Sequence, residues 1–341
     1  GSVTRNELRD PLNRREWMSK LSGGFVEPWT FGERARDWLL AHAQHFDVIH
    51  DNQTLADGIL DLQQAGLPIV TTIHHPISRD LSVALAGASG WRARLLVRRW
   101  HSFLTMQTRV AAQLNHIVTV SSASAADIAT DFGVLPNAIQ VIPNGVDTEL
   151  FRALPDVTRK SDQLIATASA DAPLKGLAVL LQAFKLLSVD RPALQLMLIA
   201  SPKPGGDTEA LISQLQLGDR IHFVGGVSHA DIVRLYAEST VAVVPSLYEG
   251  FGLPAVEAMA SGIPLVSSDG GALAEVVGDG GLLVPAGDAK ALAEAIDAVL
   301  SDAGLAAELI NRGQQRAHRT FSWSVCARLM VEQYQRCIDL C

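Results

Sequence analysis

The feature that most constrains this chain is the apolar run Val241–Val244, which a glycine-rich loop and a helical segment follow. The loop holds Gly250 and Gly252, and the helical segment covers Ala255–Ala260. A short apolar run bounded in this way is typical of a parallel strand buried on both faces. The unit therefore predicts an α/β fold and places the loop at the carboxyl end of a strand, where open parallel sheets bind ligands.

The same alternation of apolar runs and helical segments extends over most of the chain. It favours parallel sheets that are covered by helices on both faces. Two further helices are predicted clearly, at Leu55–Ala65 and Ala123–Phe132. The predicted strands are Phe46–His50, Pro68–Ile73, His116–Val120, Ile139–Ile142, Leu164–Ala168, Gln195–Ala200, Ile221–Val224, Val241–Val244, Ile263–Val266 and Gly281–Val284.

A polar, proline-containing segment, Arg152–Asp162, separates these strands into two sets and is typical of a linker. With 341 residues, the chain is long enough for two domains that each have a full core. We predict a first domain over residues 1–153, which a C-terminal helix at 324–341 rejoins, and a second domain over residues 154–323. The expected architecture is two wound parallel sheets that face a cleft.

The loop and its flanks carry a more specific signal. Glu249 and Glu257 enclose seven residues, and Ala258–Val266 continues as a helical turn and a strand. This string resembles the Glu, seven residues, Glu signature of the retaining family-4, group 1 glycosyltransferases. The resemblance implies the GT-B fold, in which two Rossmann-like domains face a cleft. It also implies transfer of a sugar, with retention, from a nucleotide-diphosphate sugar to a hydroxyl of a glycan, lipid or small molecule.

The resemblance assigns the site for the sugar donor residue by residue. Glu257 would accept hydrogen bonds from the ribose hydroxyls, and Glu249 would lie beside the transferred sugar, since one carboxylate can accept two hydroxyl donors. Lys175 matches the phosphate-binding lysine of the family and would stabilise the charge that grows on the leaving diphosphate. The remaining predicted donor contacts are made by Gly225, Phe251, Gly252 and Leu253.

At one position the chain departs from the family pattern. Ser169 stands where the family usually carries an arginine that also binds the diphosphate. A bidentate arginine–phosphate pair is stronger than a neutral hydrogen bond, so its loss predicts a weaker grip on the diphosphate. Lys175 then carries more of that interaction, unless Lys203 replaces the missing guanidinium.

Two histidines, His74 and His75, follow the predicted strand Pro68–Ile73. A lone histidine is most often structural, but two at the carboxyl end of a strand point to a ligand edge. The resembling enzymes place a histidine here, near the donor sugar, and His74 aligns better than His75. The predicted catalytic residues are therefore Glu249, His74 and Lys175.

The resemblance implies a reaction without a metal ion, and no cofactor is expected beside the donor substrate. Lys175 and helix N-termini would neutralise the diphosphate, which itself accepts the proton of the attacking hydroxyl in a front-face mechanism. Two alternatives stay open. One is a non-catalytic module that binds nucleotide sugars, and the other is a different GT-B enzyme, such as a nucleotide-sugar epimerase.

Residues 1–40 do not contain the apolar strand and glycine-rich loop with which a GT-B protein normally begins. The resemblance therefore implies a first domain that is truncated at its N-terminus and lacks roughly its first two β–α units. An unfinished parallel sheet exposes an apolar edge. We therefore expect self-association through this incomplete sheet.

The formal net charge of −8 argues against a nucleic-acid partner, because phosphate binding needs a basic surface. The sequence shows neither a membrane span nor a signal peptide, so we expect a cytoplasmic protein. The segment Trp91–Trp100 is basic and carries two tryptophans. It is either a helix with one packed face and solvated arginines, which we favour, or a peripheral contact with the inner face of a membrane.

Overall fold

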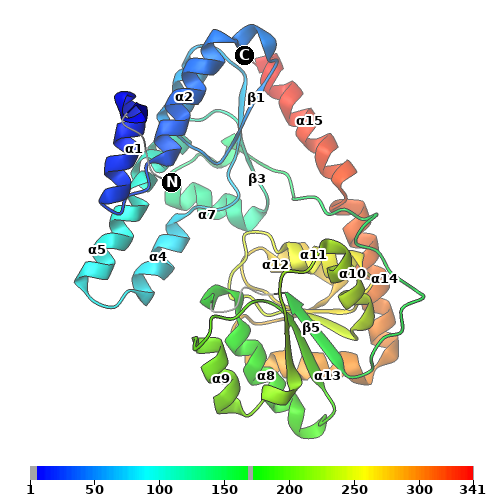
Figure 1. The fold of residues 1–341 in the computed structure, drawn as a ribbon. Coiled ribbons are helices and arrows are strands. Elements are labelled where there is room, and N and C mark those ends of the chain that lie inside the picture. The colour runs from blue at the N-terminus through cyan, green and yellow to red at the C-terminus, as the bar shows by residue number, and fades with distance from the viewer. Residues whose placement is uncertain (1–5, 168–171, 341) are drawn as a thin grey trace. The chain divides into compact units, whose positions relative to one another are not determined.

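The computed structural model describes residues 6–167 and 172–340 and divides into two compact units (Figure 1). Unit 1 comprises residues 1–142 and 329–341, and unit 2 comprises residues 143–328. In the described residues every strand pairs in parallel with its neighbours, and helices connect the strands. The prediction of an α/β protein with two Rossmann-like parallel-sheet domains is confirmed.

The sheet of unit 1 has the strand order β1-β2-β3-β4 in the part of the chain that the structure describes. Apolar side chains cover both of its faces, and Cys337 of α15 is fully buried on one of them. The elements are α1 (Pro11–Leu21), α2 (Glu27–Ala41), β1 (Ile49–Asn52), α3 (Asp57–Gln64), β2 (Ile69–Thr72), α4 (Ser78–Gly87), α5 (Trp91–Trp100), α6 (Leu104–Ala111), β3 (Ile117–Thr119), α7 (Ser122–Phe132), β4 (Ile139–Val141) and the C-terminal part of α15 (Trp323–Leu340).

The N-terminal region is helical. Among residues 6–48 the structure shows α1, α2 and two short 3₁₀ turns but no strand, and β1 forms an edge of the sheet. The predicted strand Phe46–His50 begins later than expected, at Ile49. Phe46 packs beside Trp38 of α2, with ring centroids 5.7 Å apart, so it belongs to the helical layer and not to the sheet. Self-association through the β1 edge stays a prediction.

Unit 2 has the strand order β10-β9-β8-β5-β6-β7 in the described residues. The chain builds β5, β6 and β7 outward in one direction and then returns to the other side of β5 for β8, β9 and β10. The topological switch point therefore lies between β5 and β8. The elements are β5 (Gln163–Thr167), α8 (Leu177–Asp190), β6 (Gln195–Ile199), α9 (Asp207–Leu215), β7 (Ile221–Val224), α10 (His229–Glu238), β8 (Val241–Val244), α11 (Leu253–Ala260), β9 (Leu265–Ser268), α12 (Leu273–Val277), β10 (Leu282–Val284), α13 (Ala289–Ser301) and α14 (Ala303–Thr320).

The unit boundaries differ from the predicted domain limits. They fall after Ile142 and after Arg328, whereas the sequence suggested residues 153 and 323. The backbone N–H of Val146 donates to the carbonyl of Phe321 at 2.7 Å, and that of Trp323 donates to the carbonyl of Val146 at 3.3 Å. These backbone bonds attach the segment after β4 to unit 2, which a reading of linker composition could not reveal.

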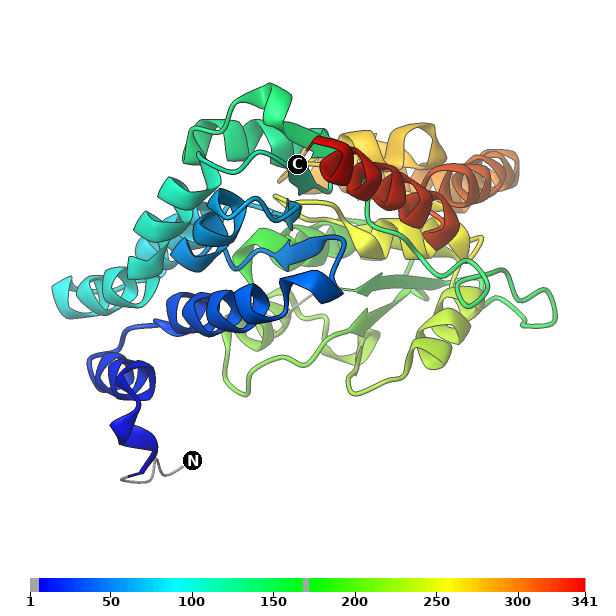
Figure 2. The same ribbon diagram turned by 90° about the horizontal axis from the view of Figure 1, so that it is seen from above.

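The basic segment forms α5, which makes a hairpin with α4 at the periphery of unit 1 (Figure 2). The expected packed face of this helix is only partly covered, because none of the ten residues of α5 is buried. Trp91, Leu95 and Leu96 are exposed, while Trp100 stacks on Phe25 with centroids 5.1 Å apart. No helix within the described residues is long and apolar enough to span a bilayer.

Candidate functional site

The central feature of unit 2 is an ion pair at the switch point between β5 and β8. Lys175 follows β5, and its Nζ donates to Oε1 of Glu249, which follows β8, at 2.8 Å. The hydroxyl of Ser246 donates to the same oxygen at 2.8 Å. The Glu249 side chain is only 11% exposed, and its Oε2 has no hydrogen-bond partner among the described residues. The pair therefore fixes one carboxylate oxygen and leaves the other available for a ligand.

A close backbone approach at Gly176 brings these two loops together. Gly176 has φ +66°, and a Cβ at this position would lie 1.9 Å from the carbonyl oxygen of Pro245. Beside it, the backbone N–H of Leu247 donates to the carbonyl of Leu174 at 2.8 Å. Only glycine fits both the left-handed conformation and the contact, because backbone atoms cannot move aside. The Lys-Gly pair of the sequence is therefore a packing requirement as well as a source of charge.

The Glu249 loop is held from its other side by the loop after β9. The backbone N–H of Ala272 donates to the carbonyl of Glu249 at 2.9 Å, and a Cβ on Gly271 would lie 2.4 Å from that oxygen. Ser268 donates its hydroxyl to the carbonyl of Ser246. Glu249 is thus positioned by backbone contacts on both sides, so its orientation does not depend on a flexible loop.

Helix α11 begins directly after this loop. Gly252, with φ +99°, is the N-cap residue, and no side chain caps the helix there. Uncapped N–H groups and the helix dipole favour an anion at this end. Leu253 is 41% exposed, while Phe251 is buried edge-to-face against Phe321. The side chain of Phe251 therefore packs in the protein interior, and only its backbone could make the predicted contact with the sugar donor.

Glu257 lies one turn further along α11 and is half-buried. Burial raises the pKa of its carboxyl, and the charge of His229 acts in the opposite direction. Among the described residues its carboxylate accepts no hydrogen bond from protein. Burial also raises the pKa of Tyr236, with Glu257 as a second cause, and the Tyr236 hydroxyl lies 3.3 Å from the hydroxyl of Thr167. Glu257 is thus a desolvated acceptor without a partner, as expected of a ligand-binding carboxylate.

The other predicted donor residues follow neighbouring strands. Gly225 comes directly after β7, and a Cβ there would lie 2.4 Å from the hydroxyl of Ser201, which follows β6. Both belong to the carboxyl edge that Lys175 and Glu249 share. Ser169 lies outside the residues that the structure describes.

In unit 1, His74 is held at the end of β2 by the last residue of β1 and the residue after it. Its Nε2 lies 2.8 Å from Oδ1 of Asn52, and its backbone N–H donates to Oε1 of Gln53 at 2.7 Å. The amide of Gln53 donates in turn to the carbonyl of His75 at 2.8 Å. Burial, with His75 and His50 as lesser causes, lowers the pKa of His74. Burial therefore disfavours the charged form of the His74 ring.

The same edge stores backbone strain. Gln53 and Leu55 have positive φ angles, 62° and 51°, although neither is glycine. The buried carboxylate of Asp51 accepts hydrogen bonds from the backbone N–H groups of Thr54 and Leu55 at 3.2 Å each and so supports this turn. No local pattern of the sequence revealed that Gln53 positions His74. In unit 2, the role of Ser246 was missed in the same way.

Comparison with known proteins agrees with this geometry. The fold and the site define a two-domain protein of GT-B architecture whose charged residues meet at the switch point of the second sheet. A family model described as "Glycosyl transferases group 1" matches residues 155–316, and one described as "Glycosyltransferase Family 4" matches residues 5–150. The chain belongs to this glycosyltransferase family.

Curated relatives cover almost the whole chain. It is 44% identical, over 337 residues, to the MMP alpha-(1->4)-mannosyltransferase of Mycolicibacterium hassiacum, a match that spans 98% of this chain and 81% of that protein. It is 30% identical to a phosphatidyl-myo-inositol mannosyltransferase of Mycobacterium leprae, over 89% of this chain and 76% of that protein. Both relatives are glycosyltransferases by name.

Solved structures show the same fold. Sucrose-phosphate synthase from Thermosynechococcus elongatus matches with a TM-score of 0.74 and 25% identity, over 100% of this chain and 81% of that one. HepE of Anabaena, solved in complex with UDP, matches with a TM-score of 0.71 and 21% identity, over 88% and 82% of the two chains. At this identity the likeness to HepE shows the fold alone.

Proposed function

We propose that this protein is a retaining α-mannosyltransferase that moves mannose from a nucleotide-diphosphate donor to a hydroxyl of a saccharide acceptor. The assignment of the donor site rests on the ion pair between Lys175 and Glu249 at the switch point, whose Nζ and Oε1 atoms lie 2.8 Å apart. The choice of mannose and of a saccharide rests on the name of the relative that is 44% identical over 98% of the chain.

Each part of the site has a chemical task in this proposal. Lys175 and the uncapped start of α11 stabilise the negative charge that develops on the leaving diphosphate. The free Oε2 of Glu249 accepts hydroxyls of the sugar, while Oε1 stays bound to Lys175 and Ser246. Glu257 accepts the ribose hydroxyls, which supply the hydrogen bonds that its desolvated carboxylate lacks.

The linkage in the relative's name supports retention. Mannose is α-linked in its nucleotide-diphosphate donors, so an α product keeps the configuration. In a front-face reaction the bond to the leaving oxygen breaks as the acceptor oxygen attacks from the same side. The leaving phosphate oxygen takes the acceptor's proton. Such a step needs no metal ion and no protein nucleophile, and its requirement is charge stabilisation at Lys175 and α11.

The test is a transfer assay with GDP- and UDP-linked mannose and glucose and with α-mannoside acceptors. We expect transfer of mannose in preference to glucose, an α-configured product by NMR, and activity that survives a metal chelator. A β product would refute retention, and loss of activity on chelation would refute the metal-independent route. His74→Asn should lower kcat if this histidine belongs to the reaction.

The two alternatives give different results in the same experiment. A binding module would bind a nucleotide sugar tightly, by calorimetry, and yield neither transfer nor hydrolysis. An epimerase would convert one nucleotide sugar into another without any acceptor. The Lys175–Glu249 pair favours transfer, because a cation beside the diphosphate helps that group to leave.

A further inference from the structure

Unit 1 contains a cavity of about 650 Å³ that the proposed reaction does not use. Helix α1, the segment before α2, the end of α5 and the start of α6 enclose it. Its volume falls within the range of small-molecule sites in proteins. The residues that line the cavity include Arg15, Ser22, Phe25, Trp29, Arg99 and Phe103.

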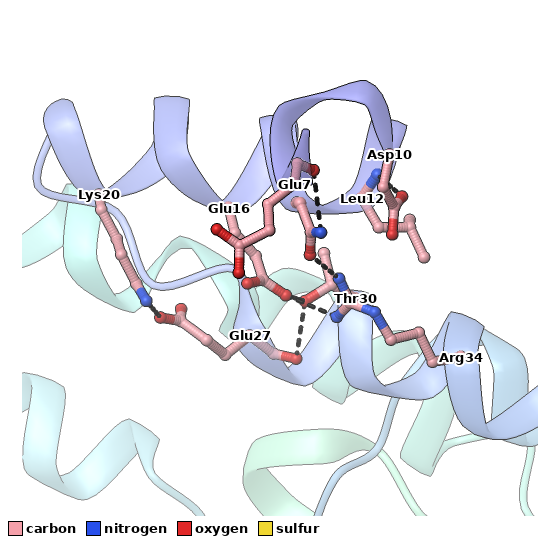
Figure 3. A network of polar contacts seen from close by, with 9 residues as sticks. Glu7, Asp10, Leu12, Glu16, Lys20, Glu27, Thr30 and Arg34 are labelled. Atoms are coloured by element: carbon pink, nitrogen blue, oxygen red, sulfur yellow. Dashed lines mark hydrogen bonds and ion pairs between the residues drawn. The ribbon is translucent and has the colours of Figure 1, made fainter. Parts of the chain in front are cut away.

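The wall made by α1 is fixed to α2 by a network of polar contacts (Figure 3). Arg34 of α2 donates to Oε1 of Glu16 at 2.7 Å and to Oδ1 of Asn13 at 2.8 Å. Thr30 donates its hydroxyl to the same Glu16 oxygen, and Lys20 forms an ion pair with Glu27 at 3.0 Å. These contacts lie at several turns of α1, so the cavity wall is braced along its length.

Two guanidinium groups in the cavity have no carboxylate partner among the described residues. Arg99 donates to the hydroxyls of Ser22 at 2.8 Å and Ser102 at 3.1 Å, which occupies only part of its five N–H donors. The Arg15 guanidinium lies 3.6 Å from the centroid of the Trp29 ring and makes no hydrogen bond within the described residues. By contrast, the third arginine of the cavity, Arg109, is paired with Asp57.

Aromatic rings form the apolar side of the cavity. Phe25 stacks on Trp100 and meets Phe103 edge-to-face at 5.5 Å, and Phe103 is buried. Gly24 leaves room for this arrangement, since a Cβ there would lie 2.7 Å from Cζ of Arg99. The Arg99 guanidinium is thus fixed by two hydroxyls, which lowers the cost of ordering it when a ligand binds.

We propose that this cavity binds a small organic anion, a phosphate or carboxylate carried on a hydroxylated or apolar body. Arg99 and Arg15 would bind the anionic group, since guanidinium forms strong charge-assisted pairs with both anions. The serine hydroxyls and the aromatic surface would contact the body. None of the residues predicted for the donor site lines this cavity, so the proposal goes beyond the proposed function.

The test is calorimetric titration of the protein with mannose 6-phosphate, mannuronate and methyl α-mannoside. The first two differ in the anion, and the third is neutral. We expect saturable binding of at least one anion, about tenfold tighter than that of the neutral sugar. The stronger of the two anions identifies the ligand as phosphate or carboxylate. Failure of the proposed transferase function would not affect this result, because the titration requires no turnover.

Matched variants distinguish anion binding in the cavity from non-specific attraction by the positive charge of the surface. Arg15→Gln and Arg99→Gln should each weaken anion binding about tenfold. Arg14→Gln and Arg98→Gln remove the same charge next to the cavity but outside it, and they should change anion binding less than about twofold. Because the Arg15 guanidinium makes no hydrogen bond within the described residues, Arg15→Gln should lower the free energy of unfolding by no more than about 1 kcal/mol. Equal losses in all four variants, or no saturable anion binding up to about 10 mM, would overturn the proposal.

Discussion

The two units assemble the carboxyl edges of their sheets by different means. In unit 2, backbone meets backbone at Gly176 and Gly271, and the charged pair Lys175–Glu249 lies between the loops. In unit 1, side-chain amides of Asn52 and Gln53 hold His74. Backbone contacts tolerate no change of residue, while side-chain contacts can be altered one at a time. The edge of unit 2 is therefore fixed by its backbone, whereas the edge of unit 1 depends on individual side chains.

The units also differ in their surfaces. Unit 1 exposes many large apolar residues, most of them on its N-terminal helices and α5: Trp17, Met18, Leu21, Phe31, Trp38, Leu40, Phe46, Trp91, Leu95, Leu96, Trp100 and Leu135. Exposed apolar surface marks sites of interaction. A concentration series in light scattering tests the predicted self-association of this unit, and a monomer at high concentration would contradict it.

The largest effect is expected at the backbone contact of unit 2. Gly176→Ala places a Cβ against the carbonyl oxygen of Pro245, and we expect it to lower the free energy of unfolding of unit 2 by about 4 kcal/mol. The control is Gly226→Ala, with a similar φ of +69° but no atom within 4 Å, which should cost about 1 kcal/mol. Denaturant unfolding followed by NMR signals of unit 2 measures both. Equal losses would show that the contact does not hold the loops together.

The charged pair should matter for catalysis more than for stability. Lys175→Met should lower kcat about 100-fold, because it removes a cation from the leaving diphosphate. Lys160→Met is a matched control, since Lys160 forms an ion pair with Glu238 at 3.0 Å in the same unit and lies outside the site. It should leave kcat unchanged and alter the unfolding free energy by less than about 1 kcal/mol. A normal kcat in Lys175→Met would remove this lysine from the reaction.

The pH dependence of donor binding should reflect Glu257. Its raised pKa means that the carboxylate becomes protonated above its usual range near 4.5 as pH falls, so affinity for a nucleoside diphosphate should decrease in that window. Glu257→Gln should weaken binding at pH 7 and flatten this dependence. Calorimetry at several pH values measures both, and an unchanged profile in the variant would place the titrating group elsewhere.

Glu257 in unit 2 and the histidines His74 and His50 in unit 1 should contribute to stability with opposite pH dependence. The pKa of Glu257 is raised in the folded state, so protonation of this carboxyl stabilises the fold. This contribution is fully present below pH 4.5, the ordinary pKa of the group, and is lost as the pH rises through the pKa of the folded state. The pKa values of His74 and His50 are lowered in the folded state, so the neutral form of each ring stabilises the fold. This contribution is present above pH 6.5, the ordinary pKa of histidine, and is lost as the pH falls through the pKa of the folded state. Glu257→Gln should therefore stabilise unit 2 slightly at pH 7.

Intrinsic fluorescence separates the two responses, because five of the six tryptophans lie in unit 1 and only Trp323 lies in unit 2. Unit 1 should unfold more readily as pH falls below about 6.5, the ordinary histidine pKa. His74→Asn should make this change shallower. An unfolding midpoint of unit 1 that does not vary between pH 7 and 5 would show that these histidines do not contribute.

Much of the fold was predictable from local sequence. The strand Val241–Val244 and the end of the following helix at Ala260 were placed correctly, because an apolar run beside glycine and proline has few other structures available. The helix itself begins two residues earlier than predicted, at Leu253. The first strand was misplaced at Phe46, whose apolar side chain packs on a helix instead. The domain limits shifted because hydrogen bonds distant in sequence, such as Val146 to Phe321, attach the linker to unit 2.

The sequence by itself determined the α/β class, the family resemblance and the residue types of the donor site, since periodicity and motif spacing are local properties. Only the tertiary structure decided that Lys175 pairs with Glu249, that burial desolvates Glu257, and that Gln53 holds His74. Each of these depends on which strands become neighbours, and the order of strands in a sheet is set by the packing of the whole chain. The cavity around Arg99 has the same origin, because its walls come from helices far apart in sequence.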